Sequence, residues 1–256
     1  MLTPPEIARS LLAAGESKAR LPFGKMLLLA ILAGAYIALA GVGATAAVTV
    51  ESGSLAKLLS ACVFPAGLSM VILAGSELFT GNCLMVMALL ERRITPVQLL
   101  RNWLTVYLGN AVGGAAVAAL AVYSHTASIF GDGLARSMVS IAESKAALGA
   151  GDAFLRGVLC NFLVCLAVWM AAASKRAEGK VIALFFPILL FVLCGYEHCI
   201  ANLYYLPAGA FAAAEYGMET TLTLAGCLKN LAAVTLGNLV GGAALGVGYR
   251  FAYLKE

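Results

Sequence analysis

Two eight-residue segments with one polar pattern lie inside long apolar stretches of this sequence. Both read Gly-x-Glu-x-x-x-x-Asn, and they span residues 75–82 and 195–202. Each is followed by a second match, in which Asn, Leu-Gly-Asn and Gly-Gly recur with identical spacing within 102–114 and 230–242. Two matched pairs in the same order indicate that the chain contains two copies of one unit.

The composition excludes an ordinary soluble domain. Of the 256 residues, 62% are hydrophobic and only 12% are charged, whereas a soluble domain has about twice that charged share. A chain with so little polar surface needs lipid as its solvent, so the bilayer is the first partner that the sequence predicts.

Six stretches are long and apolar enough to cross a membrane, since a spanning helix needs roughly 20 apolar residues. They are 26–50, 57–90, 103–123, 154–173, 181–206 and 229–249. We therefore expect an all-α membrane protein with six transmembrane helices in a single domain, 26–249. Repeat one covers 26–123 and repeat two covers 154–249. Because three spans is an odd number, the second copy enters the membrane from the opposite side, which makes the repeat inverted.

The polar octets predict breaks in the second and fifth spans. A glutamate facing lipid at the membrane centre costs a few kcal/mol, and irregular backbone is tolerated there only inside protein or beside a water-filled cavity. The alternative is two continuous helices whose Glu and Asn side chains bond across the bundle. Both interpretations place the octets at the centre of the protein.

Lysine and arginine predict the orientation. The side that holds both termini carries 12 of them and the other side carries 5, so we expect both termini in the cytoplasm. The net charge of +4 reflects this bias and indicates no nucleic-acid partner. Residues 1–25 are expected to form a cytoplasmic amphipathic helix, with Ile7, Leu11 and Leu12 facing either the membrane or the protein, and 250–256 a cytoplasmic tail.

The seven cysteines include no Cys-x-x-Cys pair and lie mostly in apolar segments. Small buried hydrophobes are the simplest interpretation. The sequence predicts no metal site, no disulfide framework and no cofactor.

Four motifs resemble the formate/nitrite transporter family. They are Leu-Ala-Gly-Ser-Glu-Leu-Phe-Thr-Gly-Asn (73–82), Leu-Val-Cys-Leu-Ala-Val-Trp-Met (163–170), Gly-Tyr-Glu-His-Cys-Ile-Ala-Asn (195–202) and Val-Thr-Leu-Gly-Asn (234–238). The resemblance implies an aquaporin-like 3+3 inverted repeat with broken helices 2 and 5. It also implies a homopentamer with one pore in each protomer, in a bacterial or archaeal inner membrane. The octets look closer to the nitrite-channel and hydrosulfide-channel branches than to the formate-channel branch.

The resemblance also implies two apolar constrictions along a pore. Leu68 and Phe191 would form the cytoplasmic one, and Phe64 and Leu78 would form the other. An apolar ring strips water from an ion, which is costly for a bare charge.

The polar positions of the pore follow from the same resemblance. His198 would lie between the constrictions with Thr80 nearby, and Lys145 would face the outer vestibule as an attracting cation. Asn161 and Asn238 would support the site. His198 could donate a hydrogen bond to a passing anion, or lend it a proton, because imidazole titrates closest to neutral pH.

The two octet glutamates are expected to hold the broken segments rather than to touch substrate. A carboxylate repels an anion, so Glu77 and Glu197 are assigned to backbone N–H groups of the breaks, together with Asn82 and Asn202.

The sequence thus predicts a channel or facilitator for small monovalent anions, nitrite or formate. A hydrosulfide channel of the same fold is one alternative. A cation-coupled carrier that uses Glu77 and Glu197 as ligands is another. A membrane enzyme using His198 and Cys199 is disfavoured, because neighbouring helical residues point about 100° apart.

Overall fold

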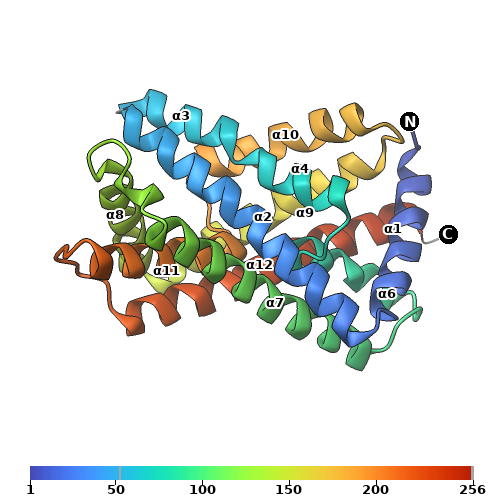
Figure 1. The fold of residues 1–256 in the computed structure, drawn as a ribbon. Helices are drawn as coiled ribbons and strands as arrows, with labels where there is room; N and C mark the ends of the chain where they lie inside the picture. The colour runs from blue at the N-terminus through green and yellow to red at the C-terminus, as the bar shows by residue number, and fades with distance from the viewer. Residues whose placement is uncertain (52, 255–256) are drawn as a thin grey trace.

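The computed structural model describes residues 1–51 and 53–254, which form helices and no strand (Figure 1). In chain order the helices are α1 (Pro4–Ala19), α2 (Phe23–Val50), α3 (Gly53–Val63), α4 (Pro65–Ala74), α5 (Phe79–Asn82), η1 (Cys83–Met85), α6 (Val86–Leu90), α7 (Pro96–Tyr123), η2 (Thr126–Ser128), α8 (Gly133–Ala147), α9 (Ala150–Ala172), α10 (Ala177–Leu193), α11 (Cys199–Glu215) and α12 (Leu224–Tyr253). The expected all-α fold class is confirmed.

Long apolar helices make up most of the molecule. Five segments of the described chain are long and apolar enough to cross a membrane, namely α2, α3 with α4, α7, α9 and α12. The fifth predicted span instead falls on α10 and α11, which have 17 residues each. Large apolar side chains lie exposed along the outside, such as Leu104, Leu108 and Leu120 of α7. The count of six spans stays a prediction.

The two halves of the chain pack in matching pairs. Helix α2 runs along α7, and α9 runs along α12. A Cβ added at Gly113 would fall on the carbonyl oxygen of Ile31, and one added at Gly241 would fall on that of Val158. Matched glycines therefore let the backbones of both pairs approach closely.

Both octets begin where a helix ends. Gly75 closes α4 with φ of 75°, and Gly195 follows α10 with φ of 70°. Both values lie in the left-handed region, which glycine adopts at little cost. The next helices begin at Phe79 and at Cys199. In the non-helical segments that precede them, backbone N–H and C=O groups lack helical partners and must be satisfied by side chains.

Helix α1 packs on the protein. Its first turn is fixed by Glu6, whose carboxylate accepts the backbone N–H of Thr3 at 2.7 Å. Ile7 and Ala8 are buried in a cluster that includes Trp169. The first residue of the expected apolar stripe, Ile7, thus contacts the protein, and the position of α1 relative to the membrane stays a prediction.

Two helix boundaries differ from expectation. The segment before α9 forms α8, an amphipathic helix that the sequence analysis treated as part of a connection. Helix α12 continues to Tyr253, through the start of the expected tail at 250, while residues 255–256 lie outside the described residues. The start of α1 and the end of α12 lie on the same side of the molecule (Figure 1).

Candidate functional site

Three cavities follow one another through the protein. The α1-side vestibule, of about 340 Å³, is lined by residues that include Lys18, Leu68 and Leu78. The α8-side vestibule, of about 310 Å³, is lined by residues that include Phe64 and Phe191. All four apolar residues also line a central cavity of about 10 Å³ between the two vestibules, so the three cavities form one path.

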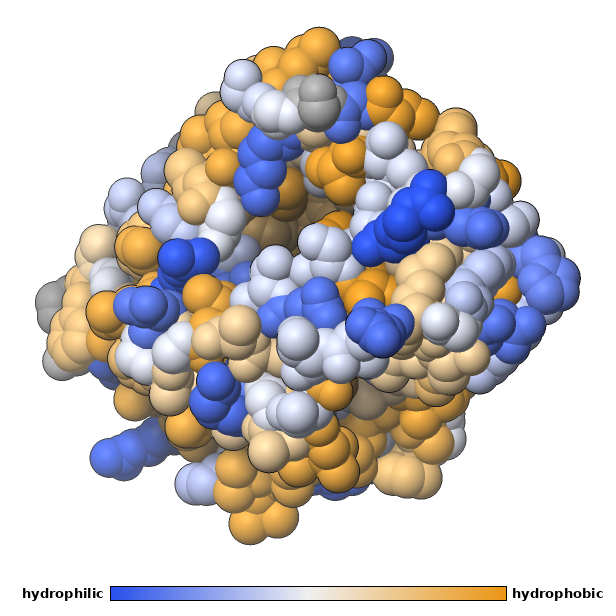
Figure 2. Space-filling model, turned by 90° about the vertical axis from the view of Figure 1, so that its left-hand side faces the viewer, coloured by the Kyte–Doolittle hydropathy of each residue, from blue (hydrophilic) through white to orange (hydrophobic). Residues whose placement is uncertain are grey.

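The α8-side vestibule opens as a hollow on the face that carries α8 and the start of α3. Figure 2 shows this face, with hydrophilic side chains around the rim and apolar surface deeper inside. The gradient matches what an ion meets on entering, first a polar mouth and then an apolar constriction.

The pairing of the constriction residues predicted from the resemblance is wrong. Leu68 and Leu78 together separate the α1-side vestibule from the central cavity. Phe64 and Phe191 together separate it from the α8-side vestibule. Their rings meet edge to face with centroids 5.6 Å apart. Leu68 lies on α4 and Leu78 in the break that follows it, whereas Phe64 precedes α4 and Phe191 lies on α10. The order of these residues in the sequence does not reveal which of them face each other.

His198 is the single polar side chain among those that line the central cavity. It is 3% exposed and also reaches the α8-side vestibule. Its ring stacks on Phe191 with centroids 5.8 Å apart. The backbone places it as the N-cap of α11, where its Nδ1 accepts the N–H of Ala201 at 3.1 Å.

That cap bond sets the tautomer of His198. Since Nδ1 is an acceptor, the ring is neutral and its proton is on Nε2. Nε2 lies 2.9 Å from Oγ1 of Thr80, so it donates to that oxygen. The hydroxyl proton of Thr80 is then free to donate elsewhere, although Thr80 is fully buried and is not among the residues that line the three cavities.

Asn110 and Asn238 satisfy the backbone of the two breaks in the same way. Asn110 Nδ2 donates to the carbonyl of Glu77 at 2.9 Å, and its Oδ1 accepts the N–H of Phe79 at 3.0 Å. Asn238 Nδ2 donates to the carbonyl of Glu197 at 2.9 Å, and its Oδ1 accepts the N–H of Cys199 at 2.8 Å. The sequence analysis assigned a supporting role to Asn238 and overlooked Asn110, its partner in the repeated Leu-Gly-Asn.

Asn161 ties the central residues of the two halves together. Its Nδ2 donates to the backbone carbonyl of Thr80 at 3.2 Å and to that of Asn238 at 2.7 Å. Asn161 is fully buried in α9. It thereby holds the residue that receives the His198 bond.

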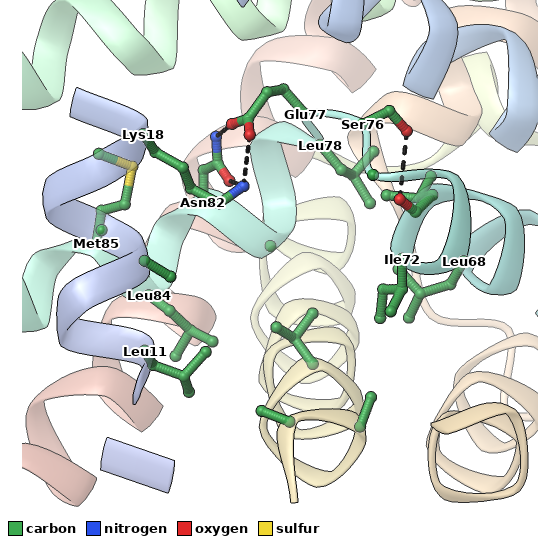
Figure 3. A pocket seen from close by; sticks show the side chains of 18 of the residues that line it. Leu11, Lys18, Leu68, Ile72, Ser76, Glu77, Leu78, Asn82, Leu84 and Met85 are labelled. Carbon is green, nitrogen blue, oxygen red and sulfur yellow. Dashed lines mark hydrogen bonds and ion pairs between the residues drawn. The ribbon is translucent and has the colours of Figure 1, made fainter. Parts of the chain in front are cut away.

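Glu77 accepts hydrogen bonds from side chains, not from the backbone N–H groups that we expected. Lys18 Nζ donates to its Oε1 at 2.8 Å and Asn82 Nδ2 to its Oε2 at 2.7 Å. Lys18 Nζ also donates to Asn82 Oδ1 at 2.9 Å. Figure 3 shows these three residues together on the wall of the α1-side vestibule.

Glu197 is held in the corresponding way on the other side. Lys145 Nζ donates to its two carboxylate oxygens at 2.9 and 3.1 Å, and Asn202 Nδ2 donates to Oε2 at 2.7 Å. Asn202 Oδ1 has no partner among the described residues. Lys145 thus lines the α8-side vestibule, and its charge is balanced by a buried carboxylate.

Comparisons with known proteins agree with this architecture. The model of the formate/nitrite transporter family matches residues 5–252. The chain belongs to the formate/nitrite transporter family. A probable formate transporter of Methanothermobacter thermautotrophicus is 38% identical, over 99% of this chain and 98% of that protein.

Solved structures of the formate/nitrite transporter family share the fold. An FNT family ion channel superimposes with a TM-score of 0.85 at 31% identity, over 96% of this chain and 98% of that one. A pentameric formate channel with formate bound superimposes with a TM-score of 0.80 at 32% identity, over 91% and 98%. The chain is therefore a member of a family of transporters and channels, not an enzyme.

Lys18 is the site residue that the sequence analysis missed in this family member. It was counted only as a basic residue near the N-terminus. The signal was present, because Ala-Arg-Ser and Glu-Ser-Lys-Ala occur at 8–10 and 16–19, and again with the same spacing at 135–137 and 143–146. The repeat therefore begins with α1 and α8, and each supplies a lysine to the octet glutamate of its own half.

Proposed function

We propose that this protein is a channel for small monovalent anions, with formate as the first substrate to test. The observation that supports it best is the path itself, two vestibules joined through a central cavity that has a single polar wall residue, His198. The names of the relatives, a probable formate transporter and a formate channel, favour formate.

The size of the central cavity limits what passes. A cavity of about 10 Å³ holds roughly one water-sized molecule. An anion in this position has lost most of its hydration, which is costly unless hydrogen-bond donors replace it. Among the side chains that line this cavity, the donor is the Nε2–H of His198, which Oγ1 of Thr80 also accepts.

The geometry favours hydrogen-bond donation over proton lending by His198. The neutral ring already uses Nδ1 to accept the N–H of Ala201, so its only proton is on Nε2. Giving that proton away would leave an imidazolate in an apolar cavity, and burial penalises charge strongly. The proton-linked mechanism is the alternative that the experiment below separates.

The cation-coupled alternative is disfavoured by the two glutamates. Each octet carboxylate already forms an ion pair with a lysine ammonium group, Glu77 with Lys18 and Glu197 with Lys145. A coupling cation would have to displace a lysine on each side. No contact in the structure distinguishes formate, nitrite and hydrosulfide, so hydrosulfide stays the alternative substrate.

The topology and assembly complete the proposal. The side of α1 carries 12 of the 17 basic residues, so we place both termini in the cytoplasm and the protein in an inner membrane. The pentameric relative supports a homopentamer with one path in each protomer.

The test is anion uptake into proteoliposomes by the wild type and by His198→Asn, with formate, nitrite and hydrosulfide at several pH values. Asparagine is a strong N-cap residue, so this variant keeps the cap of α11 while losing the ring. Hydrogen-bond donation predicts slower uptake with an unchanged pH dependence, whereas proton lending predicts that the pH dependence disappears. Uptake of none of the three anions by the wild type would overturn the function.

A further inference from the structure

Each vestibule contains two lysines and one glutamate, and only one lysine of each pair is neutralised. The charged residues that line the α8-side vestibule are Lys57, Lys145 and Glu197. Those that line the α1-side vestibule are Lys18, Lys180 and Glu77. Lys145 and Lys18 are the ones ion-paired to their glutamates.

The side chains of Lys57 and Lys180 make no hydrogen bond or ion pair with any described residue of the chain. The ammonium of Lys57 lies within electrostatic range of Lys145, Glu197 and Arg156. Because the pair of Lys145 with Glu197 sums to zero charge, its field falls off quickly with distance, whereas the field of a single charge does not. Among the residues that line each vestibule, the net positive charge is therefore that of Lys57 or Lys180, and on the α8 side Arg156 adds a further positive charge nearby.

The two unpaired lysines lie on equivalent helices of the two halves but not at equivalent positions, because the offset between the octets aligns Lys57 with Ala177 and Lys180 with Ser60. Lys57 lies on α3, on the same face as Ser60 and Phe64, and all three line the α8-side vestibule. Lys180 lies in the first turn of α10, the helix that supplies Phe191 to the path. On the α8 side, α3 leads from Lys57 to Phe64 of the adjacent constriction. Helix α10 instead has Lys180 in the α1-side vestibule and reaches Phe191 of the constriction on the opposite side.

The distances suit recruitment of an ion. Phe64 lies seven positions after Lys57, which corresponds to a rise of about 10 Å along a helix. The Debye length is about 8 Å at physiological ionic strength. The constriction is therefore slightly more than one Debye length from Lys57 along the helix, so the charge acts mainly on an anion that is still in the vestibule.

We propose that Lys57 and Lys180 are the residues that concentrate the anion at the two mouths of the path, while Lys145 and Lys18 position the octets. This inference rests on the proposed anion channel. It predicts different effects for the unpaired and the ion-paired lysines. Loss of Lys57 or Lys180 should change anion entry from one side only and leave folding intact.

The experiment measures formate uptake by Lys57→Gln, Lys57→Glu and Lys57→Arg in proteoliposomes of uniform orientation, at about 10 mM and about 500 mM salt. At low salt, where the Debye length is about 30 Å, we expect Lys57→Gln to slow entry from the α8 side about threefold. Lys57→Glu should slow it further and Lys57→Arg should match the wild type. The differences should shrink at high salt. Lys180→Gln should show the same pattern for entry from the α1 side.

Lys229→Gln is the matched control, since Lys229 is a lysine on the α8 side of the chain that does not line this vestibule. It should leave uptake unchanged. Equal uptake by Lys57→Gln and the wild type at low salt would overturn the proposal while the channel function stands. A loss that is the same at both salt concentrations would also overturn it. A wild type that moves no anion would instead refute the proposed function.

Discussion

Thr80 Oγ1 and His198 Nε2 lie 2.9 Å apart although 118 residues separate them in the chain. The two belong to opposite halves of the repeat. The position equivalent to His198 in the first half is Leu78, and the position equivalent to Thr80 in the second half is Ile200. Two matching breaks thus meet at a bond that neither half could make alone, and the near-symmetric scaffold gains one asymmetric polar contact.

Replacing Thr80 by valine should slow anion uptake at least about tenfold and destabilise the protein by about 1–3 kcal/mol, because the buried Nε2–H of His198 loses its acceptor. Thr80→Ser should restore most of both. Uptake and thermal unfolding in detergent are the measurements. Thr235→Val is the control, since Thr235 bonds Tyr107 at 3.1 Å away from the central cavity. A similar slowing of uptake in that control would contradict a specific role for Thr80.

Asn110→Leu and Asn238→Leu should destabilise the protein by similar amounts, roughly 2–5 kcal/mol each, since each removes an acceptor and a donor from buried backbone groups at a break. Both side chains are fully buried and make matching bonds in their two halves. Thermal unfolding of the two purified variants compares them directly. A neutral result at one position and a large loss at the other would show that the two breaks are not equivalent.

The sequence reveals the repeated unit of this fold more readily than the side-chain contacts along the path. The octets mark both breaks because Glu and Asn are costly at membrane depth unless protein or water satisfies them, and family membership and the all-helical fold are confirmed. The pairing of Leu68 with Leu78, and of Phe64 with Phe191, depends on how the helices rotate around the breaks, which no local pattern encodes. Lys18 was missed because a basic residue near a terminus is explained by the excess of basic residues on the cytoplasmic side. Only the repeated Glu-Ser-Lys-Ala shows that Lys18 is the counterpart of Lys145.

Lys145→Met should destabilise the protein more than Lys18→Met. Removing one partner of a buried ion pair costs about 3–5 kcal/mol, because the other charge is left unpaired. The side chain of Lys145 is 16% exposed and that of Lys18 is 30% exposed, so water can solvate Glu77 better after its lysine is lost. Thermal unfolding of the two variants tests the order.

The double variant Lys145→Met/Glu197→Gln should recover part of that loss, since it leaves no unpaired charge. A double variant as unstable as the sum of its single variants would indicate that the two residues contribute independently.

Glu143 provides a pH-dependent contact outside the path. Its Oε1 accepts the N–H of Thr221 at 2.7 Å and the hydroxyl of Thr220 at 2.9 Å. The backbone bond, more than the hydroxyl bond, lowers the pKa of this carboxyl from its usual value of 4.5. A lowered folded-state pKa means that the contact stabilises the segment before α12 fully above pH 4.5 and is lost as the pH falls through the folded-state pKa.

Amide exchange at Thr221 should therefore be slow at neutral pH and lose its protection as the solution is acidified below that usual value. In Glu143→Gln the side chain no longer titrates, so protection should be weaker at neutral pH and should lack the acidic transition. Ser144→Ala, which changes the neighbouring exposed residue of α8, should keep the wild-type transition. An acidic transition of the same midpoint in Glu143→Gln would assign the effect to another group.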